Sequence, residues 1–164
     1  MGYKIDVLKQ YLIRKYSYRK QNMSNEEKWA EISERRNRVE VKLRLLVKNQ
    51  LKSAYGEAKA HQQVLNSMKQ ELRPRYSSLS LNDLMDPKKC QIYFKQLGTL
   101  IENCWECSFK NVLSHNKPSI RSYFTIVNDL REDCHATEVT DDEMNSFRGA
   151  ISVLEKEVSD YFGD

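Results

Sequence analysis

Arg131 and His135 are the residues of this chain whose types and spacing best suit a chemical reaction. They stand four positions apart in LREDCHATEVTDDEM, residues 130–144. On an α-helix such a pair shares one face, about 6 Å apart along the axis, so both side chains reach one small ligand. Arginine offers a permanently charged fork to phosphate oxygens, and histidine exchanges a proton near neutral pH. The pair therefore has the groups that metal-independent RNA cleavage requires.

The same residues also fit a structural role. Asp129 and Glu132 are neighbouring carboxylates that would pair with Arg131, and a protonated histidine is favoured at a helix C-terminus. In the catalytic interpretation, Asn128 and Asp129, about one turn before the pair, are candidates for orienting it. Spacing alone leaves both interpretations open.

Composition indicates a single all-α domain over residues 1–164. The chain is 40% hydrophobic and 30% charged, and it has only five glycines and three prolines, which favours long helices over a turn-rich β fold. Its length suffices for one hydrophobic core of ordinary size. No apolar run approaches the roughly 18 residues that cross a bilayer. The four cysteines are too sparse for a disulfide scaffold. We therefore expect a cytoplasmic protein without a membrane partner.

Charge is distributed unevenly along the chain. Residues 1–75 contain 18 Lys and Arg against 8 Asp and Glu, and the remainder contains 9 against 15. A basic half suits phosphates or an acidic protein partner, and opposite halves also suit a head-to-tail dimer. Arg35, Arg36 and Arg38 form a candidate RNA-contacting surface. The longer basic run that they begin, which continues to Arg44, is most simply a solvated helix face paired with nearby glutamates.

Hydrophobic periodicity predicts a bundle of five or six helices and no strand. Capping-box spacing marks helix starts at Ser24 and Thr140, and the sequence Asp86-Pro87 is typical of another start. Gly56 is expected to end or bend a helix, and Gly98 is a candidate bend. Together these signals predict helices over about 3–19, 25–55, 57–72, 87–113, 119–135 and 141–162.

Cys104 and Cys107 form the one CxxC of the chain. With Cys90 or His135 they would make a zinc site, but structural zinc sites usually bring a second close pair and a loop. Both cysteines fall inside an apolar predicted helix, which favours small buried side chains. We predict no metal and no cofactor. Glycine-rich phosphate loops, dinucleotide fingerprints, HExxH pairs and nucleophile elbows are missing, which removes the commonest nucleotide-dependent, redox and acyl-transfer classes.

The C-terminal part of the chain resembles the HEPN superfamily of α-helical domains, many of them ribonucleases. The resemblance is carried by VNDLREDCHATEVTDDEMNSFRGAISVLEKEVSDYF, an LR…H motif followed by a capped apolar helix. It extends more weakly upstream through LIENCWECSFKNVL and KNQLKSAYG, and so covers about residues 35–162. Residues 1–30 form a basic helical extension outside it. This chain places three residues between Arg131 and His135, fewer than is usual in the family, and Glu132 follows the arginine.

The resemblance implies a bundle that dimerises so that the motif residues of two subunits form one composite RNase site. It assigns phosphate binding and transition-state stabilisation to Arg131, and general acid or base catalysis to His135. It also implies RNA as substrate, a role as a toxin or defence-system effector, and an antitoxin or larger effector complex as a further partner. Some HEPN domains are non-catalytic. The alternative is therefore a dimerisation or docking module in which the pair belongs to a salt-bridge network.

Overall fold

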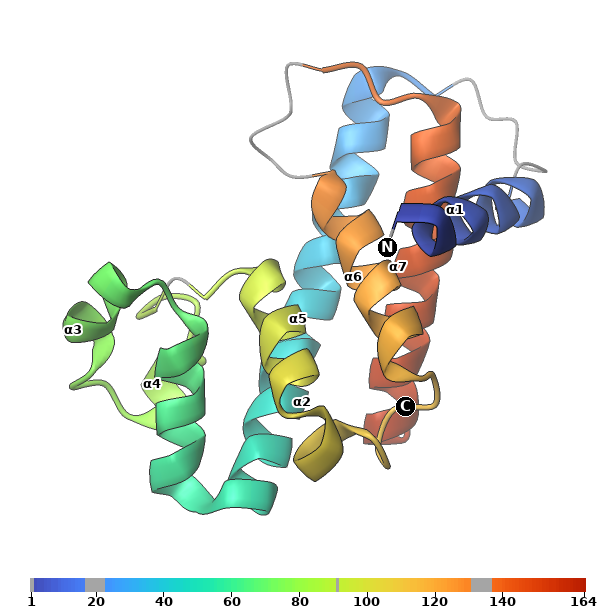
Figure 1. The fold of residues 1–164 in the computed structure, drawn as a ribbon. Coiled ribbons are helices and arrows are strands. Elements are labelled where there is room, and N and C mark those ends of the chain that lie inside the picture. Colours follow the sequence, from blue (N-terminus) through green and yellow to red (C-terminus); the bar gives the residue numbers. More distant parts are fainter. Residues whose placement is uncertain (1, 17–22, 91, 131–136) are drawn as a thin grey trace.

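The computed structural model describes residues 2–16, 23–90, 92–130 and 137–164, and within these ranges the regular elements are helices without any strand (Figure 1). The predicted all-α class is confirmed. In these ranges no helix has an apolar stretch long enough to cross a bilayer. The elements are α1 (Gly2–Tyr16), α2 (Asn25–Ser67), the 3-10 helix η1 (Gln70–Leu72), α3 (Arg73–Tyr76), α4 (Leu81–Leu84), α5 (Phe94–Asn103), the π-helix η2 (Trp105–Phe109), α6 (Lys117–Asp129) and α7 (Asp141–Phe162).

The first part of α2 forms a bundle with α5, α6 and α7 (Figure 1). The parts of α2 and α7 that lie side by side run in the same direction, and α6 runs the opposite way beside α7. Phe94 of α5 and Phe124 of α6 stack with ring centroids 4.9 Å apart. A Cβ atom at Gly98 would lie 2.8 Å from the Phe124 ring, so the glycine permits the close approach of α5 and α6.

Local signals in the sequence explain where α2 and α7 begin and where α2 turns. The Ser24 hydroxyl accepts a hydrogen bond from the backbone N–H of Glu27, and the Glu27 carboxylate accepts one from Ser24 N–H. Thr140 and Glu143 make the same reciprocal pair before α7. Gly56 has φ +74°, a left-handed conformation, and here the second part of α2 turns away from the bundle. Both predicted capping boxes and the predicted bend are confirmed.

Helix α1 crosses α7 near the N-terminal end of α7 (Figure 1). Leu12 is its buried anchor, with 3% of the side chain exposed. A Cβ atom at Gly149 of α7 would lie 2.6 Å from a Leu12 methyl group and 3.0 Å from Leu12 Cβ. Because Gly149 has no side chain, Leu12 can pack directly against α7 at this position. Through this contact the basic N-terminal helix packs against the bundle.

The helix predicted over 87–113 begins at Phe94, so the predicted start at Pro87 is wrong. The Asp86 carboxylate accepts a hydrogen bond from Lys88 N–H at 2.9 Å, which closes one turn. The chain then leads the buried residue Ile92 into the core before α5 starts. A cap followed by proline marks a helical turn, but burial of the following residues ends that turn early.

Arg44 is buried, although we assigned it to a solvated basic face. Its guanidinium pairs with Glu40 one turn earlier, at 2.6 Å, and donates a hydrogen bond to the backbone oxygen of Ile92. The Ile92 carbonyl, which precedes α5, thus accepts a hydrogen bond from a charged donor. This contact draws the arginine inward, since a buried carbonyl without a donor would be costly.

Candidate functional site

Arg131 and His135 lie outside the described residues, so their predicted joint site stays a prediction. The helix expected over 119–135 ends earlier: α6 stops at Asp129, and Leu130 has backbone angles of φ −100° and ψ 79°. The expectation that this helix continues through His135 is wrong. The structure describes the residues on either side of 131–136, which are Leu130 and Thr137.

Before the segment come Asn128 and Asp129, the two predicted orienting residues. Asn128 is half-buried in the last turn of α6, and Asp129 is exposed. The Asp129 carboxylate forms an ion pair with Lys9 of α1 at 3.4 Å. Such an exposed pair contributes little stability, but it connects the N-terminal helix to the end of α6. No local pattern predicts this contact, because the two residues are far apart in the chain.

After the segment, the chain is fixed on the first turns of α2. The carbonyl oxygen of Thr137 accepts hydrogen bonds from the Asn25 amide and from the Trp29 indole, each 3.3 Å away. Val139 N–H donates to the Asn25 side-chain oxygen at 2.9 Å, and Lys28 Nζ donates to the Val139 carbonyl at 2.7 Å. Three side chains of one helix therefore hold the backbone that follows the predicted catalytic pair. None of the three residues was predicted from the sequence to have this role.

Lys28, which binds the Val139 carbonyl, also contacts the start of α7. Its ammonium group lies 2.7 Å from the Asp141 carboxylate, in the first turn of that helix. The hydrogen bond from Lys28 holds the pKa of Asp141 below its ordinary value. Lys28 is buried, so one desolvated cation serves both a carbonyl and a carboxylate.

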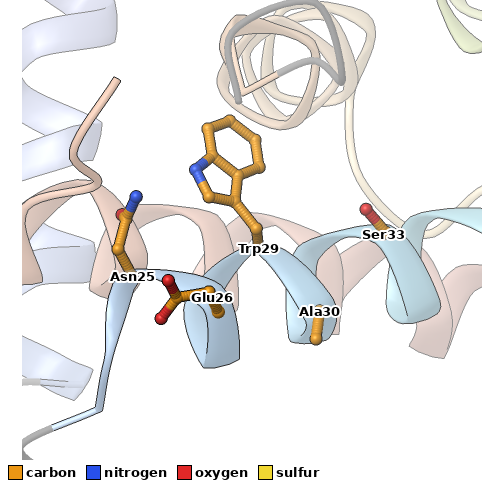
Figure 2. A pocket seen from close by; sticks show the side chains of 5 residues that line it. All are labelled: Asn25, Glu26, Trp29, Ala30 and Ser33. Carbon is orange, nitrogen blue, oxygen red and sulfur yellow. The ribbon is translucent and has the colours of Figure 1, made fainter. Parts of the chain in front are cut away.

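A cavity of about 360 Å³ opens on α2 beside Asn25 and Trp29, the two residues that bind the Thr137 carbonyl (Figure 2). It is lined by Asn25, Glu26, Trp29, Ala30 and Ser33. Figure 2 shows the Trp29 indole standing up from the helix and the short side chain of Ala30 on the opposite side of it. An amide, a carboxylate, a hydroxyl and an indole suit a small polar ligand rather than an apolar one.

The three arginines proposed as an RNA-contacting surface have different surroundings. Arg35 is half-buried: its guanidinium donates to Glu155 at 3.0 Å and to the Ser152 hydroxyl at 2.9 Å. Arg36 lies over the Phe94 ring, 5.5 Å from its centroid. Arg38 has a side chain that is 59% exposed and only long ion-pair contacts of 4.0 Å. Of the three, Arg38 is the one with an accessible guanidinium.

Glu31 joins this arginine cluster to α7. Arg148 donates two hydrogen bonds to the Glu31 carboxylate, of 2.8 Å from Nε and 2.5 Å from a terminal nitrogen. The Arg35 guanidinium lies 3.5 Å from the same carboxylate. The hydrogen bonds from Arg148 hold the pKa of Glu31 below its ordinary value, although burial acts in the opposite direction. This network holds α2 and α7 together beside the cavity.

The cysteines differ from the prediction in one respect. Cys90 and Cys104 are buried, as expected, but Cys107 is exposed. The predicted continuous helix over 87–113 changes at Cys104 into the π-helix η2, and the wider turn places Cys107 at the surface. In the described part of the chain, no group of three or more His, Cys, Asp and Glu residues is placed to hold a metal ion.

Neither a protein-family model, nor a curated protein, nor a solved structure matches this chain. The likeness to HEPN domains accordingly rests on the sequence motif.

Proposed function

We propose that this protein is a metal-independent RNA endonuclease of HEPN type, acting in the cytoplasm as a homodimer through Arg131 and His135. One observation supports the proposal: Thr137, two positions after His135 in the sequence, is fixed by Asn25 and Trp29 beside a cavity of about 360 Å³ that has polar groups in its lining. A cavity of this volume has room for a nucleotide. The sequence motif supplies the chemistry, and the cavity supplies a binding region.

The proposed reaction is an internal transesterification. His135 takes the proton of the ribose 2′-hydroxyl, and the 2′-oxygen attacks phosphorus. The bond to the 5′-oxygen breaks, and His135 of the partner subunit protonates that oxygen. Arg131 stabilises the charge on the phosphate oxygens. The products are a 2′,3′-cyclic phosphate and a free 5′-hydroxyl, and no metal is required.

The cavity would receive the nucleobase next to the cleaved bond. The Asn25 amide is already committed to Thr137 and Val139. Glu26 and Ser33 then remain as the polar lining groups that read the base. A carboxylate accepts hydrogen bonds from base amino and imino groups, so the proposal favours bases that carry such donors.

The test is RNA cleavage in EDTA by the wild type and by Arg131→Ala and His135→Ala. We expect each substitution to lower the cleavage rate by about 100-fold or more. His61→Ala is the matched control, because His61 contacts the carbonyl of Leu79 and lies outside the proposed site; it should cleave like the wild type. Light scattering should report a dimer. Equal loss of RNA, or none, with all four proteins would contradict the proposal, as would cleavage by a monomer.

A second candidate function, a non-catalytic docking module, is favoured by an exposed stripe on α2. Val41 is 64% exposed and Leu45 is 43% exposed. Arg38 precedes them, and Lys48 and Lys52 follow them, at spacings of three and four residues that keep all five on one face. Two apolar residues between cations fit a partner helix that has apolar residues flanked by carboxylates.

Replacing Val41 and Leu45 together by Ser separates the two functions. If the protein is a docking module, the double variant loses its acidic partner helix while the fold persists, and Arg131→Ala has no effect on that binding. If the protein is a nuclease, the double variant still cleaves RNA. A synthetic acidic amphipathic helix, titrated by fluorescence anisotropy, is the probe. Equal affinity for the wild type and the double variant would rule out the stripe as a docking surface.

A further inference from the structure

Two thiols and one tyrosine hydroxyl meet where η2 packs on α2. Cys104 ends α5, and Cys107 lies three residues later in η2. Burial raises the pKa of Tyr55, just before the bend at Gly56, to about 12, and the neighbouring Cys107 and Cys104 add to the rise. Cys104 Sγ also donates to the Gln63 side-chain oxygen at 3.8 Å.

The two thiols differ in access to solvent. Cys104 has 2% of its side chain exposed, whereas Cys107 is exposed. One thiol is therefore open to a small reagent in solution, and the second lies behind it. Residues three apart in a helical turn have Cα atoms on the order of 5 Å apart, which is within the range that a disulfide spans.

We propose that Cys104 and Cys107 are a reversible modification site at which a low-molecular-weight disulfide, such as glutathione disulfide, converts the two thiols into an internal disulfide. This inference is independent of RNA cleavage. It gives a function to the CxxC spacing. Neither the proposed RNase site nor packing of the core explains why Cys107, which is exposed, is a cysteine.

The reaction has two exchange steps. The Cys107 thiolate attacks one sulfur of glutathione disulfide, the S–S bond breaks, and a glutathione thiolate leaves. The Cys104 thiolate then attacks the Cys107 sulfur of the mixed disulfide, and the second glutathione thiolate leaves. The two protons from the cysteines end on the two glutathione thiolates. Two protein thiols are oxidised, and one glutathione disulfide is reduced to two molecules of glutathione.

The surroundings of Cys104 make the second step pH-dependent. Burial raises the pKa of the Cys104 thiol, and the hydrogen bond with Tyr55 acts in the opposite direction. The attacking thiolate is therefore scarce at neutral pH, and ring closure should accelerate as the pH rises. The mixed disulfide on Cys107 should be visible as an intermediate at low pH.

Mass spectrometry of the full chain after incubation with glutathione disulfide tests the proposal. Trypsin releases residues 96–110 as one peptide, because Lys95 and Lys110 bound it, and this peptide holds Cys104 and Cys107 and no other cysteine. We expect it to lose two hydrogen atoms, and dithiothreitol to restore them. A peptide that carries glutathione on Cys107 without ever losing two hydrogens, or one that stays fully reduced, would overturn the proposal.

Variants assign the order of attack. Cys104→Ser should accumulate glutathione on Cys107, because the resolving thiol is missing. Cys107→Ser should remain unmodified in 96–110, because Cys104 is shielded. Cys90→Ala is the matched control, since Cys90 is equally buried but stands alone, and it should form the disulfide like the wild type. Should a variant fail to fold, the wild-type peptide decides alone. Glutathione on Cys104 in the Cys107→Ser protein would contradict the assigned order.

Discussion

The indole nitrogen of Trp29 donates a hydrogen bond to the carbonyl oxygen of Thr137, 3.3 Å away. This bond joins the second turn of α2 to the residue that follows the segment of Arg131 and His135. Asn25 donates to the same oxygen. Thr137 is thus held by two side chains that also line the cavity on α2.

Trp29→Phe keeps an aromatic ring and removes the donor to Thr137. We expect a loss of about 1 kcal/mol in the free energy of unfolding, typical of one hydrogen bond. We also expect a lower rate of RNA cleavage, because the chain after the catalytic pair is held less firmly. Trp105→Phe is the control: Trp105 is buried in η2, away from the cavity, so it should affect stability and leave cleavage by the folded protein unchanged. Urea unfolding and an RNA assay measure the two effects.

The Glu31–Arg148 pair makes stability depend on pH in the acidic range. Because the pKa of Glu31 is lowered in the folded protein, its carboxylate stabilises the fold above its ordinary pKa. That stabilisation is lost as the pH falls below the ordinary pKa of a glutamate, about 4.3. Glu31→Gln should therefore be less stable than the wild type at pH 7, by about 2 kcal/mol. The difference should shrink as the pH falls, and a difference that stays constant from neutral to acidic pH would refute this role.

Gly149→Ala should weaken the contact of α1 with α7. The added methyl would lie 2.6 Å from a Leu12 methyl and 3.0 Å from Leu12 Cβ, so the helices must separate. We expect a loss of about 1 to 3 kcal/mol. Leu12→Ala makes room for the new methyl, at a cost of about 2 to 5 kcal/mol of its own. In that background Gly149→Ala should be neutral or stabilising, since alanine favours helix over glycine by about 1 kcal/mol. Additive losses in this double-mutant cycle would show that the two residues do not share the contact.

Glu157 should be essential to the loop before α6. Only 4% exposed, its carboxylate accepts hydrogen bonds from the backbone N–H of Ser114 at 2.8 Å and of His115 at 3.0 Å. It also contacts His115 Nδ1 at 2.5 Å. Glu157→Gln replaces one acceptor oxygen by an amide group that faces these donors, so we expect a loss of about 2 to 3 kcal/mol. Asp160→Asn is a neighbouring control on the exposed side of α7, where the carboxylate pairs with Lys156. A similar, small loss for both variants would contradict the role of Glu157.

Local chemistry made part of the fold predictable. The reciprocal hydrogen bonds of Ser24 with Glu27 and of Thr140 with Glu143 depend on spacing within one turn, and Gly56 bends α2 because it tolerates a positive φ. The all-α class follows from composition and periodicity. These features involve residues that are near in sequence.

Long-range contacts were not predictable in the same way. Arg44 was assigned to a solvated face, and it is buried because the carbonyl of Ile92, far along the chain, needs a donor. The early end of α6 at Asp129 and the π-helix that exposes Cys107 were not predicted either. The contacts of Thr137 with Asn25 and Trp29 also link the two ends of the chain. No pattern in one sequence reports such pairs.

The most direct test of the central claim compares two substrates in EDTA: a single-stranded RNA, and the same sequence with 2′-O-methyl groups. The wild type should cleave the RNA to products that end in 2′,3′-cyclic phosphate. It should leave the methylated strand intact, and His135→Ala should cleave neither. Cleavage of the methylated strand, equal cleavage of RNA by His135→Ala, or an RNA that stays intact with the folded wild-type dimer would contradict the account.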